Sequence, residues 1–181
     1  AVIDGSATIG SDIVVENLTI NAAKSLTINS GNSLTVTGTL TNSAGASGLV
    51  IESGGSLKHS STGVQATVKR TIDAWGGAAV GWHLLSSPVT DQPFQSVFIS
   101  NPPAITEDFY LWDETTNYWV NNKVGTEAPF TFNTAAFGDE FSVGKGYLAA
   151  YQNTSTKEFT GTLTTGDVAG IQLSYTTSSG R

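Results

Sequence analysis

The sequence predicts an all-β protein in which a short β-solenoid, residues 1–62, is followed by an antiparallel β-sandwich or jelly-roll domain, residues 63–181. Three observations support this fold class. A short phrase repeats in the first part, every Trp, Tyr and Phe lies at or after Trp75, and no segment has the 3.6-residue period of an amphipathic helix. The segregation of the aromatic residues indicates a boundary between two domains.

The first part repeats one phrase at a spacing of about eight residues. Its copies are "NLTI", "SLTI", "SLTV", "GLVI" and "GSLKH". Apolar residues alternate within each copy, as at Leu34, Val36 and Leu40, which is the period of a strand with one buried face. Gly, Asn and Ser between the copies favour tight turns. We therefore expect three to five solenoid turns that form a structural stalk or spacer, with a meander of antiparallel hairpins as the alternative.

The second part contains longer segments with strand patterns. They are "VQATVKRTI", "GWHLLSSPV", "DFYLWDE", "NYWVNNK", "PFTFNT", "EFSVGKGYLAAYQ", "KEFTGTL" and "IQLSY". Gly, Pro, Asn or Asp separates nearly all of them, as in all-β sandwiches. Within "LWDETTNYWV" we expect a hairpin that places Trp112 and Trp119 opposite each other.

This hairpin is the predicted ligand site. Tyr110 and Trp112 share one face of their strand, while Phe109 and Leu111 share the other, so one face is expected to be core and the other free. Exposed aromatic rings stack on sugar rings, and neighbouring polar side chains fix the hydroxyls. The expected glycan-binding residues are Tyr110, Trp112, Asp113, Asn117 and Trp119. The alternative is that the aromatic residues of the hairpin are core or domain-interface residues.

Composition excludes several partner classes. The net charge is −7 and the eight Lys and Arg residues are scattered, so we expect no nucleic-acid partner. No apolar run approaches eighteen residues, so we expect no membrane insertion. The absence of Cys rules out disulfides, thiol nucleophiles and Cys-ligated zinc.

Catalytic and metal motifs are weak. "GWHLLSSPVTD" brings His83, Ser86, Ser87 and Asp91 together in sequence, but triad partners meet through the fold, and the G-x-S-x-G elbow is missing. The paired acidic residues suit solvated loops better than a glycosidase pair. We expect no enzyme activity and no cofactor, with calcium held by Asp139, Glu140 and backbone carbonyls as the alternative.

The order "GWHLLSSPV", "FYLWDETTNYWV" and "FSVGKGYLAAY", after a Ser/Thr/Asn/Gly repeat, resembles a module of large adhesin-like surface proteins of Bacteroidetes-type bacteria that use the type IX secretion route. The resemblance covers roughly residues 17–175 and implies no catalytic residues. It implies a location outside the cell or on the bacterial outer surface, within a longer polypeptide. The carboxy-terminal sorting domain of that family is missing from this sequence.

These observations predict a non-enzymatic, exported surface protein that acts in adhesion, presentation or scaffolding and contacts a glycan or another cell-surface ligand. The alternative is a carbohydrate-binding module appended to a polysaccharide-degrading enzyme.

Overall fold

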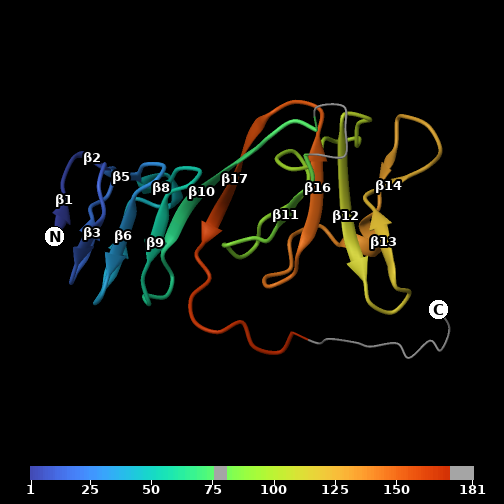
Figure 1. Ribbon diagram of the computed structural model, residues 1–181. Helices are drawn as coiled ribbons and strands as arrows, with labels where there is room; N and C mark the ends of the chain where they lie inside the picture. The colour runs from blue at the N-terminus through green and yellow to red at the C-terminus, as the bar shows by residue number, and fades with distance from the viewer. Residues whose placement is uncertain (76–80, 172–181) are drawn as a thin grey trace. The chain divides into compact units, whose positions relative to one another are not determined.

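A computed structural model describes residues 1–75 and 81–171 (Figure 1). The chain forms two compact units, and each is described by itself. The first consists of Ala1–Thr71, Pro88–Gln92 and Thr156–Asp167. The described residues of Ile72–Ser87, Pro93–Ser155 and 168–171 form the second.

The first unit is a β-solenoid of about three turns, which confirms the predicted solenoid. Its strands are β1 (Val2–Ile3), β2 (Ser6–Ile9), β3 (Ile13–Val15), β4 (Leu18–Ile20), β5 (Ser25–Ile28), β6 (Ser33–Val36), β7 (Leu40–Asn42), β8 (Leu49–Ile51) and β9 (Ser56–Lys58). A 3₁₀ turn, η1, spans Ala46–Gly48. The strands form the parallel ladders β1-β4-β7, β2-β5-β8 and β3-β6-β9. The alternative meander of antiparallel hairpins is therefore wrong.

Successive copies of the repeated phrase lie in different sheets of the solenoid. The Leu residues that stack are further apart, since Leu18 is paired with Leu40 and Leu26 with Leu49. The eight-residue spacing is therefore the distance from one sheet to the next around a turn. A phrase does not stack on the next copy, because a full turn is needed to return to the same sheet.

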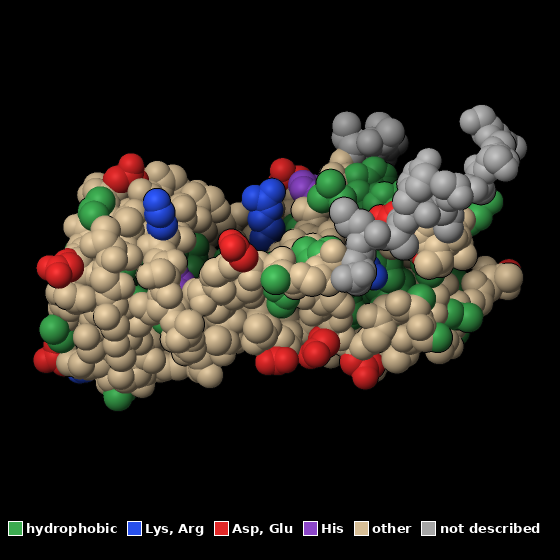
Figure 2. Space-filling view, turned by 90° about the horizontal axis from the view of Figure 1, so that it is seen from below, with side chains coloured by type: hydrophobic (Ala, Val, Ile, Leu, Met, Phe, Trp, Pro, Cys, Tyr) green, Lys and Arg blue, Asp and Glu red, His purple; other side chains and the backbone are tan. Residues whose placement is uncertain are grey.

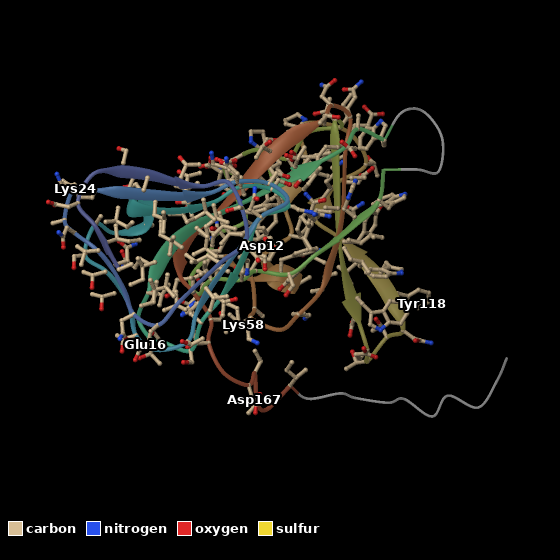
Figure 3. All side chains as sticks on the ribbon, turned by 60° about the vertical axis from the view of Figure 1, so that its left-hand side comes forward. Asp12, Glu16, Lys24, Lys58, Tyr118 and Asp167 are labelled. Carbon is tan, nitrogen blue, oxygen red and sulfur yellow. The ribbon has the colours of Figure 1, made fainter. Side chains whose placement is uncertain are left out.

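Tight turns close the solenoid corners. At one corner the Asn32 N–H donates to the Asn29 carbonyl at 3.2 Å. The third residue of each such turn has positive φ: Gly31 (76°), Gly54 (86°) and, at the corner between β4 and β5, Ala23 (59°). Charged side chains such as Lys24 and Glu16 project outward from this unit (Figure 3).

One solenoid sheet continues beyond β8. The strand β10 (Gln65–Ile72) pairs in parallel with β8, with Thr67 opposite Val50. The strand β17 (Ser155–Thr162) follows β10 in the same sheet. The predicted boundary between residues 62 and 63 falls inside the first unit, because β10 extends a ladder that earlier strands began.

The second unit contains an antiparallel sheet in the order β11-β16-β12-β13. Its strands are β11 (His83–Leu85), β12 (Glu107–Asp113), β13 (Tyr118–Asn121) and β16 (Tyr147–Tyr151). A smaller pair, β14 (Lys123–Val124) and β15 (Thr131–Phe132), and one helical turn, α1 (Thr134–Phe137), complete the elements. The segment 140–146 lies outside the strands, and most of "IQLSY" lies outside the described residues. The second sheet of a sandwich stays a prediction.

Aromatic side chains fill one face of this sheet. Phe94 is fully buried, and its ring centroid lies 4.4–6.2 Å from those of Phe109, Phe132, Phe137, Phe141 and Tyr147. Burying each such side chain contributes roughly 1.5–3 kcal/mol. The core of the unit therefore lies on the Phe109 side of the sheet.

Candidate functional site

The opposite side of this sheet, here called the outer face, carries half-exposed aromatic residues. Along β12 the side chains of Phe109 and Leu111 are buried, whereas those of Tyr110 and Trp112 are only partly buried. Because successive side chains of a strand point to opposite faces, Tyr110 and Trp112 lie on the outer face. The expected division into a core face and a freer face is confirmed.

The first aromatic pair on the outer face joins the two strands of the predicted hairpin. Trp112 is opposite Trp119, and their ring centroids lie 5.3 Å apart with planes at 64°. Trp119 is 45% exposed. Such edge-to-face pairs add roughly 0.5–1.5 kcal/mol beyond burial. The pair fixes both indoles while leaving part of Trp119 available to a ligand.

A second pair lies further across the same face. Trp82, 44% exposed, approaches Tyr110 edge-on with ring centroids 5.6 Å apart. Gly81, directly before Trp82, has φ 106°, and a Cβ there would clash with the Trp75 Cα. Only glycine fits this position, so the "GW" sequence positions Trp82 through a backbone requirement. We call Trp82, Tyr110, Trp112 and Trp119 the aromatic stripe.

The charged groups beside the stripe form an ion pair. Asp108 lies on the outer face two residues before Tyr110, and its Oδ1 accepts a hydrogen bond from the Lys123 Nζ at 3.0 Å. The same Nζ lies 5.4 Å from the Phe130 ring centroid. Burial, and then the negative charge of Asp108, raises the pKa of Tyr110, so its phenol stays neutral. The stripe therefore lies beside groups whose charges are balanced.

The hairpin tip uses two of the predicted ligand residues for its own structure. Asp113 Oδ1 accepts from the Thr115 N–H (2.9 Å) and hydroxyl (2.7 Å), and Oδ2 accepts from the Thr116 hydroxyl (2.7 Å). These bonds lower the pKa of Asp113 to about 2. Asn117 has φ 62°, and its N–H donates to the Asp113 carbonyl at 2.8 Å. Both residues therefore shape the turn that joins β12 and β13.

An open groove of about 740 Å³ adjoins the hairpin within the second unit. Trp112, Val120, Lys145 and Ile171 are among its lining residues. A Cβ on Gly144 would lie 2.7 Å from Ile171 Cδ1, so the glycine permits this close approach. Lys145 and apolar residues therefore line the groove together with Trp112, and so do the acidic residues Asp113 and Glu114.

Asp139 and Glu140, the predicted calcium ligands, are exposed and lie far along the sequence from the stripe. The Asp139 carbonyl accepts the Phe94 N–H at 3.1 Å, and Glu140 forms an isolated bridge with Pro93. Within residues 1–75 and 81–171, no cluster of three or more His, Cys, Asp or Glu side chains has the arrangement of a metal site. Calcium at Asp139 and Glu140 stays a prediction.

Two residues of the outer face, Trp82 and Leu84, were not predicted from the sequence. In the structure Leu84 is 74% exposed, whereas Leu85, on the His83 side, is buried. Leu84 is opposite Leu148, which is in turn opposite Tyr110, so both Leu residues lie on the outer face. The pairing of β11 with β16 decides which face these side chains occupy. The three-residue sequence of β11 is too short to show it.

These features define a nearly all-β protein with a solenoid and a sheet whose outer face is rich in aromatic residues. The chain belongs to the family described as "Domain of unknown function (DUF8693)", whose model matches residues 2–180. No curated protein and no solved structure matches the chain. In the part of the chain that the structure describes, no helix has the length and apolar character needed to cross a bilayer.

Proposed function

We propose that this protein is a non-enzymatic, exported surface module that acts in adhesion or presentation, with the solenoid as a spacer and the outer face of the second unit as its binding surface. The observation that carries the proposal is the aromatic stripe. Trp82 and Trp119 stay nearly half exposed although a full aromatic core is available on the other side of the same sheet. Tryptophan in such positions is typical of binding surfaces.

Glycan is the proposed ligand class. The C–H faces of sugar rings pack on indole and phenol rings, while hydroxyls require hydrogen-bonding neighbours. Asn121 lies opposite Tyr110 on the outer face, which supplies an amide beside the rings. Of the five predicted ligand residues, Tyr110, Trp112 and Trp119 belong to this surface. Asp113 and Asn117 support it by forming the turn.

The proposed location is extracellular, on a bacterial outer surface, with export by the type IX route. The support is the resemblance in motif order together with the physical reason found for "GW" at Gly81. A sandwich architecture for the second half belongs to the same proposal, supported by an antiparallel sheet with one fully buried face. Protease accessibility on intact cells, with and without a functional secretion machinery, tests the location.

A carbohydrate-binding module of a polysaccharide-degrading enzyme is the second candidate. The two aromatic pairs favour it, since several exposed rings on one face of a sheet suit a long polysaccharide chain. Pull-down on insoluble polysaccharides separates the two candidates. Retention on plant or algal polymers favours the enzyme-linked module, whereas binding only to cell-surface glycans favours adhesion.

The first experiment is a glycan array that compares the protein with a Trp112→Ala, Trp119→Ala double variant. Tyr118→Ala is the matched control, because Tyr118 is 72% exposed and neighbours Trp119 on β13, but strand alternation puts its side chain on the other face. Circular dichroism must first show that both variants are folded. We expect binding by the protein and the control and none by the double variant. Absence of binding by all three would reject a glycan ligand.

A further inference from the structure

The aromatic stripe crosses the sheet diagonally. Trp82 precedes β11, Tyr110 and Trp112 lie on β12, and Trp119 lies on β13. His83 and Phe109 are both opposite Ala149, so the preceding residues Trp82 and Asp108 lie at one level across the sheet. Trp112, which is opposite Trp119, lies four residues further along β12. Three strand spacings and four residue rises place the two ends of the stripe about 20 Å apart.

We propose that this stripe binds one extended, uncharged polysaccharide chain at two subsites, the Trp82–Tyr110 pair and the Trp112–Trp119 pair. This inference rests on the proposed glycan-binding function and specifies the kind of glycan. A monosaccharide or disaccharide does not cover the whole stripe, because the backbones of its end residues, Trp82 and Trp119, lie about 20 Å apart. A longer chain reaches both pairs without any change in the protein.

Apolar side chains lie beside the Trp82–Tyr110 subsite. Leu148 lies beside Tyr110 on β16, and Leu84 lies beside Leu148 on β11. Leu84 is the most exposed large hydrophobic residue that the structure describes, at 74%. A chain bound at this subsite therefore also covers apolar side chains, which favours its C–H faces over charged substituents.

Charge selects an uncharged chain over an acidic one. Asp108 and Lys123 neutralise each other at 3.0 Å, and the Lys123 side chain is only 9% exposed, so this ammonium is not available to a ligand carboxylate or sulfate. The whole protein carries a net charge of −7. Acidic side chains lie scattered over the face that Figure 2 shows, so repulsion of anionic chains is spread over the molecule.

The expected consequence is a dependence of affinity on chain length. Once a chain is bound at one pair, its contact with the other is intramolecular, so each added sugar that reaches the second pair strengthens binding until the span is complete. Losing one aromatic contact should weaken binding of long chains about three- to tenfold, as expected for a single ring–ligand contact.

Isothermal titration calorimetry with β-1,4-linked glucose and mannose oligomers, from disaccharide to octasaccharide, tests the inference. The proteins compared are the full chain, Trp82→Ala, Trp119→Ala and the control Tyr118→Ala, each with its melting temperature measured. We expect affinity to rise with length and then level off. In Trp82→Ala the rise should disappear while short oligomers still bind as before.

Each other outcome contradicts a stated part of the proposal. Affinity that is independent of length, or equal weakening of short and long chains by both variants, would show a single subsite and leave glycan binding itself intact. Equal or tighter binding of galacturonate oligomers would overturn the selection of uncharged chains. No binding of any oligomer would reject the proposed function as well. Sedimentation that detects a dimer abolished by Trp82→Ala would assign the face to a second copy of this chain.

Discussion

Trp112 and Trp119 face each other across the β12–β13 ladder, with ring centroids 5.3 Å apart and planes at 64°. This contact closes the hairpin just before its polar turn. It also orients two of the rings on which the proposed ligand would lie. The same pair should therefore contribute both to stability and to binding, and the two contributions are separable by experiment.

We expect Trp112 and Trp119 to be energetically coupled. In a double-mutant cycle with Trp112→Ala, Trp119→Ala and the double variant, the coupling free energy should be about 0.5–1.5 kcal/mol, because each single substitution already removes the edge-to-face contact. Urea unfolding measures the four free energies. Tyr118→Ala, combined with Trp112→Ala, should be additive. Additivity of the two Trp substitutions would show that the ring contact contributes nothing.

The Asp113 turn should weaken in acid. The pKa of Asp113 is about 2 in the folded protein and 3.8 ordinarily, so the folded state favours the carboxylate. A group whose pKa is lowered in the folded state stabilises the folded protein at pH values above its unfolded-state pKa. This contribution is lost as the pH falls through the folded-state pKa. The stability difference between the protein and Asp113→Asn should be constant above about pH 5 and shrink between pH 3.8 and pH 2.

NMR titration of the Asp113 carboxyl carbon measures the pKa directly, and urea midpoints at several pH values measure the stability difference. A midpoint near 3.8, or a stability difference that does not change with pH, would contradict the assigned hydrogen bonds to Thr115 and Thr116.

The sequence predicted the β12–β13 hairpin and its two faces because both follow from local alternation around a polar tip. It predicted the solenoid because the repeat is short and rich in turn residues. Which phrases stack was not predictable, since the partner of Leu26 lies a full turn away at Leu49. The packing around Phe94 was also missed, because the ring sits in an irregular segment that has no period.

Ala23 occupies a position that favours glycine. Its φ of 59° matches the left-handed conformation that Gly31 and Gly54 adopt at the equivalent place in other corners. Glycine adopts the left-handed conformation without the steric cost that alanine has, but it loses more conformational entropy on folding. The net effect should make Ala23→Gly more stable by about 0.5–1 kcal/mol. Ala22→Gly is the matched control, because Ala22 is equally exposed without positive φ and should lose stability. Thermal unfolding measures the melting temperatures of both variants. A shift of both melting temperatures in the same direction would contradict the argument.

The Glu107 side chain holds the segment before β12 against the sheet through hydrogen bonds. Its side chain is 7% exposed. Oε1 accepts from the Ser100 N–H (2.9 Å) and hydroxyl (2.8 Å), and from the Ala104 N–H (3.2 Å). The Tyr151 hydroxyl nearby donates to the Phe98 carbonyl at 2.8 Å, and burial, followed by the charge of Glu107, raises the pKa of Tyr151.

Removing this acceptor should be costly. Glu107→Ala leaves the part-buried donors of Ser100 and Ala104 without their partner. An unsatisfied buried donor costs about 1–3 kcal/mol, so we expect a loss of about 1–2 kcal/mol for these part-buried groups. Glu107→Gln keeps one carbonyl acceptor and should lose less. Exposed Glu127→Ala is the control and should change stability by under about 0.5 kcal/mol. Hydrogen exchange at the Ser100 and Ala104 amides should accelerate in Glu107→Ala. Unchanged exchange at both amides would show that the carboxylate does not hold the segment.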